Sequence, residues 1–135
     1  MARDGDVRFD DKFAAARSEI ERAAAELVRE TAHGVERDVK AAMAGPHHGA
    51  TTTRGRKTHT ASAAGEAPAV DTGTLINSVT TENDDGGGVF STTVGTAIEY
   101  AGLLEGGTAT IEPRPSFAPA GERAESAFQR NARKI

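Results

Sequence analysis

Residues 79–95 read VTTENDDGGGVFSTTVG and carry the strongest β-strand signal in the chain. Valine, threonine and phenylalanine, which favour strands, flank a polar run at 83–88 that contains three consecutive glycines. Asparagine, aspartate and glycine are the residues that tight turns require. The stretch therefore predicts an antiparallel β-hairpin with its turn at 83–88.

A long helix is predicted upstream, over residues 9–44. Asp10 and Asp11 supply a cap and favourable charge for its beginning, and Gly45-Pro46 ends it. Gly34 costs about 1 kcal/mol relative to alanine, so one continuous helix and two helices with a bend at 33–34 both remain open. Apolar and mostly small residues recur at steps of three and four, which suits close packing against a sheet or another subunit: Phe9, Phe13, Ala16, Ile20, Ala24, Leu27, Val35, Val39 and Ala42.

The segment between this helix and the hairpin, residues 45–70, is polar and rich in glycine, threonine and alanine. It has almost no large apolar side chain and cannot build a core of its own. β-Branched residues on both sides of Arg54-Gly55 are compatible with a hairpin arm. We therefore expect either a flexible loop or a β-arm.

Shorter elements complete the pattern. Residues 71–78 read as a short helix or turn, 97–105 as a helix, and Thr108–Glu112 as a short third strand. The final helix is predicted over 115–133, where Pro119 is tolerated only in the first turn. The expected fold is a single α+β domain spanning residues 1–135. In it, long N-terminal and C-terminal helices pack on a small, mainly antiparallel sheet that bears the loop or arm.

Composition limits the functional classes. The chain has 135 residues, 4% aromatic residues and no tryptophan, so its isolated core should be thin and subunit contacts could supply further burial. A net charge of −4 argues against general nucleic-acid binding. The absence of cysteine excludes disulfides and thiolate metal sites. With no apolar stretch of about 18 residues, we expect a soluble protein made in the cytoplasm.

No catalytic or metal-binding constellation is recognisable. The sequence lacks the nucleophile elbow, the phosphate-binding loop and the His-Glu-x-x-His motif. Its histidines, His33, His47, His48 and His59, lack the spacing of a rigid tetrahedral site. We therefore expect no enzymatic activity, no cofactor and no metal.

Four short motifs occur in an order that resembles the head-tail joining (neck or tail-completion) family of long-tailed double-stranded DNA phages. They are Asp71-Thr72-Gly73-Thr74-Leu75 with Ser78, then Tyr100-Ala101, Glu105-Gly106-Gly107-Thr108, and finally residues 113–120, which read PRPSFAPA. Residues 65–120 carry the resemblance. Two departures are Ser116, which separates the proline from the phenylalanine of the last motif, and the doubled glycine before Thr108. They put in doubt the start of the last helix and the length of a loop.

The resemblance implies a structural virion protein that assembles into a ring, expected to be a homohexamer, at the neck between head and tail. Its partners would be head connector, stopper or portal-side proteins on one side and a tail-terminator or tail-tube protein on the other. Genomic DNA would pass through the channel with transient, nonspecific contacts, and no membrane would be involved. The subunit would be assembled in the host cytoplasm. The alternatives are a tail-terminator or connector-stopper ring protein of the same neck, and a small DNA-binding module.

Candidate residues fall into three groups. A ring interface is expected at Tyr100, Leu104, Glu105, Arg114 and Phe117, with Glu105 pairing with an arginine of a neighbour, for example Arg114. A basic cluster able to contact DNA phosphate or an acidic partner is formed by Arg54, Arg56, Lys57 and His59. Capping and glycine backbone freedom are expected of the structural motif, whose residues are Asp71, Gly73, Leu75, Ser78, Gly107, Pro115 and Pro119. Ordinary turn residues and solvated side chains are the alternative interpretation.

Overall fold

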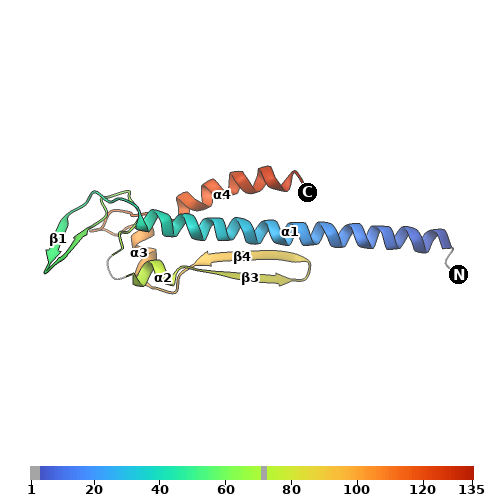
Figure 1. Cartoon of the computed structure of the whole chain (residues 1–135), viewed down its shortest axis with the longest axis horizontal. Helices are drawn as coiled ribbons and strands as arrows, with labels where there is room; N and C mark the ends of the chain where they lie inside the picture. The colour runs from blue at the N-terminus through green and yellow to red at the C-terminus, as the bar shows by residue number, and fades with distance from the viewer. Residues whose placement is uncertain (1–3, 71–72) are drawn as a thin grey trace.

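A computed structural model describes residues 4–70 and 73–135, with the side chains of the first helix described from Phe13 onward. Helices and antiparallel strands are mixed along the chain, so the predicted α+β class is confirmed (Figure 1). The elements are α1 (Asp4–Ala44), β1 (Thr51–Arg54), β2 (Lys57–Thr60), α2 (Thr74–Ser78), β3 (Thr80–Gly86), β4 (Val89–Gly95), α3 (Tyr100–Gly106) and α4 (Phe117–Ala132).

Helix α1 is continuous over 41 residues, a length of about 60 Å. It ends before Gly45-Pro46, as predicted, but it begins at Asp4, so Asp10 and Asp11 lie inside the helix and the predicted N-terminal cap is wrong. No break occurs at Gly34. Gly34 lies in the groove between α1 and α4, where tertiary packing offsets the low helix propensity of glycine.

The predicted hairpin is present as β3 and β4. The strands pair from Thr80↔Gly95 to Gly86↔Val89, so the ladder reaches further than predicted and the turn shrinks to Gly87-Gly88. Both glycines have positive φ, 62° and 79°, the conformation that a two-residue turn between twisted strands requires. Acidic and amide side chains at 83–85 are therefore strand residues rather than turn residues.

Residues 51–60 form a second hairpin, so the segment is a β-arm and not an unstructured loop. Strands β1 and β2 pair antiparallel around Gly55, whose φ is +61°. This arm is a separate two-stranded sheet that projects from the end of α1 opposite its N-terminus (Figure 1). The chain thus has two small sheets in its described part, where one was expected.

The predicted third strand at Thr108–Glu112 is wrong. The Thr108 backbone N–H donates to the carbonyl of Ile111 at 2.8 Å, and the Thr108 hydroxyl accepts the backbone N–H groups of Thr110 and Ile111. These local bonds close a turn and take the N–H groups that a strand would offer to a neighbour.

The core is small and centred on α1. Helix α4 and the β3–β4 hairpin both run along α1, on different sides of it (Figure 1). Val39, Met43, Val79 and Ala120 are buried where they meet, and the surrounding apolar side chains are only partly buried. Of the described helices, none combines the length and apolarity needed to cross a bilayer.

Candidate assembly surfaces

Glu105 connects α3 to α4. Its Oε1 atom accepts the backbone N–H groups of Ser116 at 2.9 Å and Phe117 at 3.0 Å, and its Oε2 accepts that of Ala118 at 3.0 Å. Partial burial opposes ionisation of Glu105, but the three backbone bonds outweigh it and hold the pKa of the carboxyl below its usual value. Glu105 therefore caps α4 from a distant position in the sequence.

Arg114 has partners in the same chain. Its Nε donates to the Ser62 hydroxyl at 2.8 Å, its Nη2 to the Ser62 carbonyl at 3.3 Å, and its Nη1 to the Glu112 carbonyl at 3.2 Å. An ion pair between Glu105 and the Arg114 of a neighbouring copy would compete with these bonds. Glu105 and Arg114 thus both have partners within the same chain, and their place at a ring interface stays a prediction.

The two glycines of the structural motif have the backbone conformation that was predicted. Gly73 has φ +83° and Gly107 has φ +76°. A Cβ atom on Gly107 would lie 2.9 Å from the carbonyl oxygen of Ile111 and equally close to Pro113, so only glycine fits this turn without strain. Asp71, the predicted cap, lies outside the described residues.

The other motif residues support the core. Leu75 packs against the buried cluster. The Ser78 hydroxyl donates to the Leu75 carbonyl at 2.6 Å and lies 2.6 Å from the Thr96 hydroxyl. Pro115 is half-buried just before α4, and Pro119 lies in the first turn of that helix, as predicted.

Tyr100 and Leu104 line the same small hollow, of about 120 Å³, together with Val70 and Leu75. Tyr100 is 47% exposed and the adjacent Leu103 is 55% exposed. We call Val70, Leu75, Tyr100, Leu103 and Leu104 the Tyr100 patch. Phe117, the remaining residue of the predicted interface, lies apart from this hollow and packs against the core.

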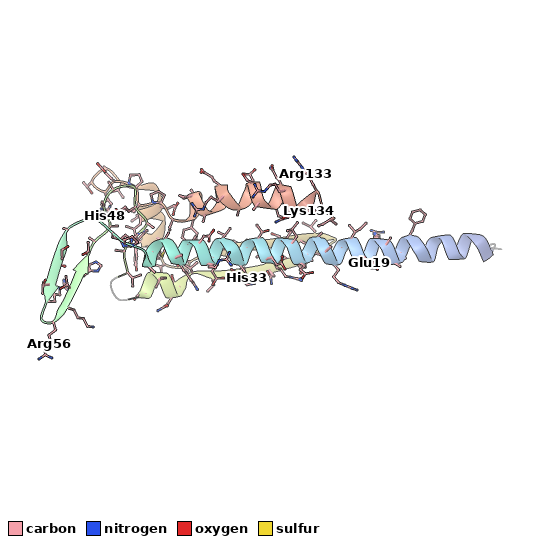
Figure 2. All side chains as sticks on the ribbon, turned by 45° about the horizontal axis from the view of Figure 1, so that its top comes forward. Glu19, His33, His48, Arg56, Arg133 and Lys134 are labelled. Atoms are coloured by element: carbon pink, nitrogen blue, oxygen red, sulfur yellow. The ribbon has the colours of Figure 1, made fainter. Side chains whose placement is uncertain are left out.

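The β-arm segregates its side chains by type. The facing pairs Thr52↔His59 and Arg54↔Lys57 lie on one face and line a common concavity. Alternation along the strands places Thr51, Thr53, Thr58 and Thr60 on the other face. Arg56 projects from the tip (Figure 2). We call Arg54, Arg56, Lys57 and His59 the basic face.

Glu66 holds the base of the arm. Its carboxylate accepts the backbone N–H of Ala63 at 2.9 Å and that of His48 at 3.0 Å, and it also pairs with the His48 ring. The bonds to the Ala63 N–H and the His48 side chain and N–H lower the pKa of Glu66 to about 2. The arm is therefore anchored at its root while its tip is exposed.

The first half of α1 extends beyond the rest of the chain (Figures 1 and 2). Every residue from 13 to 22 is exposed, and the large apolar side chains Phe13 and Ile20 are 58% and 57% exposed. We call residues 13–22 the projecting segment. The apolar spacing of the projecting segment was visible in the sequence. Its exposure to solvent was not, because exposure depends on where α4 ends.

A groove that sequence reasoning did not find lies between α4 and β4, over α1. Its volume is about 520 Å³. Half-buried apolar side chains from the three elements line it: Val28, Val35, Phe90, Val94, Phe117 and Phe128. We call it the α4–β4 groove. Phe90 and Phe128 are separated by 38 positions in the sequence, and no local signal indicates that they share a surface.

No protein-family model, curated protein or solved structure matches the chain. Function is therefore inferred from these surfaces. Within residues 13–70 and 73–135, no three histidine, aspartate or glutamate side chains come together as a metal site. The described residues provide exposed apolar surface, hydrogen bonds that connect distant segments, and a basic arm.

Proposed function

We propose that this chain is a structural subunit of a phage particle, a head-tail joining protein that acts as one member of a ring and has no catalytic activity. One observation supports assembly with neighbouring copies. The accessible surface of the chain is 9660 Å², whereas a compact monomer of 14.0 kDa exposes about 6,700 Å². The excess, about 3,000 Å², is a surface area that neighbouring copies can bury.

The distribution of apolar surface supports a ring. The projecting segment and the Tyr100 patch belong to different parts of the chain, and the α4–β4 groove is distinct from both. Contacts between unlike surfaces of identical copies generate rings when the rotation closes. We expect the ring to be a hexamer at the virion neck, between head connector or portal-side proteins and tail-terminator or tail-tube proteins.

The basic face supports a contact with DNA in the channel. Arg54 and Lys57 lie on one face of the threonine-rich arm, and Arg56 projects from its tip (Figure 2). Lysine and arginine side chains bind phosphate without reading sequence. We propose that the arm makes transient, nonspecific contacts with the genome.

The test is deletion of the gene in the phage that encodes the chain. Loss of a head-tail joining protein should leave filled heads and free tails, and the purified particle should contain the chain in one ring at the neck. Particles that lack the chain would exclude the proposal. A ring at the tail terminator or connector-stopper position would favour the alternative neck functions.

DNA titration separates the ring subunit from a small DNA-binding module. A dedicated module should bind an oligonucleotide specifically and well below micromolar concentration at physiological salt. A ring subunit should bind weakly, with a steep loss of affinity as salt rises.

A further inference from the structure

The apolar stripe of α1 continues past the part that α4 covers. Leu27, Thr31 and Gly34 line the groove between the two helices, opposite Ala124 and Ala127 of α4. The same stripe runs on through Ile20 to Phe13, where the described chain leaves every residue of the projecting segment exposed. The stripe has the spacing of a helix-packing surface, and Ile20, which is 57% exposed, lies on the part that α4 does not cover.

The projecting segment is ordered as a helix before it meets any partner. It belongs to the continuous helix α1, and Arg17 Nε donates to Glu21 Oε1 at 3.2 Å across one turn. A preformed helix loses less conformational freedom on binding than a flexible segment does. The projecting segment can therefore bind a rigid groove with little loss of conformational freedom.

The α4–β4 groove is an open apolar depression along α1. Its floor is α1, and its walls are β4 and α4. Three of the five phenylalanines of the chain, Phe90, Phe117 and Phe128, line it and remain only half-buried. Amphipathic helices bind in apolar grooves of this kind through residues spaced by three and four positions.

The groove is long enough for about three turns of a helix. Its α4 wall from Phe117 to Phe128 spans about 17 Å at 1.5 Å per residue, and one turn of an α-helix rises about 5.4 Å. We propose that the projecting segment of one copy lies in the α4–β4 groove of the next copy. This inference rests on the proposed function and specifies the contact that builds the ring.

The area available is sufficient for this arrangement. Each ring member contributes two contact surfaces of about 800 Å², which the excess of about 3,000 Å² accommodates. Pairing two projecting segments with each other would produce a closed dimer and leave both grooves open to water. Insertion covers the segment and the groove together, and it repeats from copy to copy.

The experiment uses single cysteines, because the natural sequence contains none. Full-length Ile20→Cys and Phe128→Cys are purified separately, mixed and oxidised mildly, with Ile20→Cys and Phe90→Cys as a second pair for the other wall. We expect a disulfide between the two variants of each pair. Ser18→Cys is the matched control, because at 100° per residue it lies on the opposite side of α1 from Ile20, and it should not cross-link to either wall.

Assembly gives a second measurement. Ile20→Glu should raise the apparent dissociation constant of the oligomer by about tenfold, since burial of an isoleucine side chain is lost. Ser18→Glu should leave it unchanged. Ile20 is 57% exposed, so circular dichroism should show both variants folded.

The outcomes are distinguishable. An intact oligomer in which neither wall cross-links to Ile20→Cys, or in which Ile20→Cys cross-links mainly to itself, would overturn the inference and leave the proposed function standing. Cross-links between Ile20→Cys and the groove, in a protein that is absent from the particle, would support the inference and overturn the proposed function. A monomer at every concentration would overturn both.

Discussion

The carboxylate of Glu105, in α3, accepts the backbone N–H of Phe117, the first residue of α4, at 3.0 Å. Ser116, in the N-cap position, makes no side-chain capping bond. The start of α4 is therefore fixed by a residue of another helix and not by its own sequence neighbours. Because Phe117 also lines the α4–β4 groove, this single carboxylate positions one wall of the proposed interface.

Replacing Glu105 with alanine should destabilise the fold. The substitution leaves the N–H groups of Ser116, Phe117 and Ala118 without their acceptor, and loss of an N-terminal cap costs about 1–2 kcal/mol. Urea unfolding at neutral pH measures the change. Glu112→Ala removes an equally acidic, exposed side chain nearby and should leave the unfolding midpoint unchanged; equal effects of the two variants would refute the capping role.

Acid should weaken the same junction. The pKa of Glu105 is lower in the folded chain than its usual value because the backbone bonds favour the carboxylate. Its contribution to stability is therefore complete above the usual pKa of 4.5 and is lost as the pH falls through the lower, folded value. We expect Glu105→Gln to flatten the decline of unfolding free energy below about pH 5, measured by urea titrations at successive pH values. An unchanged slope in this variant would contradict the assignment.

Two glycines that lie five positions apart should respond in opposite ways to alanine. Gly107→Ala places a Cβ 2.9 Å from the Ile111 carbonyl oxygen at a positive φ, and the strain should cost about 1–3 kcal/mol. Gly102, inside α3, has open space around the same atom, so Gly102→Ala should be neutral or stabilise by up to about 1 kcal/mol. Thermal melts of both variants test the pair. Similar melting temperatures would show that the turn can relax.

The sequence correctly predicted the elements that depend on residues next to them in the chain. The helix stop at Gly45-Pro46, the 79–95 hairpin and the first-turn position of Pro119 all depend on residues adjacent to them in the sequence. The third strand failed because the Thr108 hydroxyl competes for backbone N–H groups. The segment at 45–70 could not be separated from disorder because the bond at the root of its arm joins Glu66 to His48, 18 positions away in the sequence.

The candidate surfaces also divide into those that the sequence predicted and those that it did not. The apolar stripe through Ile20 and the cations of the arm were evident from spacing and composition. The α4–β4 groove and the roles of Glu105 and Arg114 were not, since each brings together segments that are distant in sequence. The carboxylate of Glu105, which the sequence suggested as a partner for a neighbouring arginine, accepts three backbone N–H groups of its own chain at the start of α4.

The anchor of the arm gives a further prediction. Glu66→Ala removes the acceptor for the backbone N–H groups of His48 and Ala63, so the root of the arm should open more often. Trypsin should then cleave faster after Arg54, Arg56 or Lys57, because cleavage follows the population of open forms. The rate is measured by mass spectrometry of the fragments. Glu82→Ala, an exposed glutamate on β3, is the control, and an equal cleavage rate in the two variants would contradict the role of Glu66.

The basic face should determine how binding to DNA depends on salt. Each phosphate contact releases counterions, and the logarithm of the binding constant falls with the logarithm of salt concentration by about 0.9 per contact on duplex DNA. Replacing Arg54, Arg56 and Lys57 with glutamine should therefore weaken binding and reduce the slope by up to about 2.7. Fluorescence anisotropy at several salt concentrations measures both quantities. The matched control replaces Arg130, Arg133 and Lys134 with glutamine, which removes the same charge from the C-terminal end of the chain (Figure 2). If the two triple variants lose affinity equally, net charge and not the arm governs the contact, and the basic face has no special role.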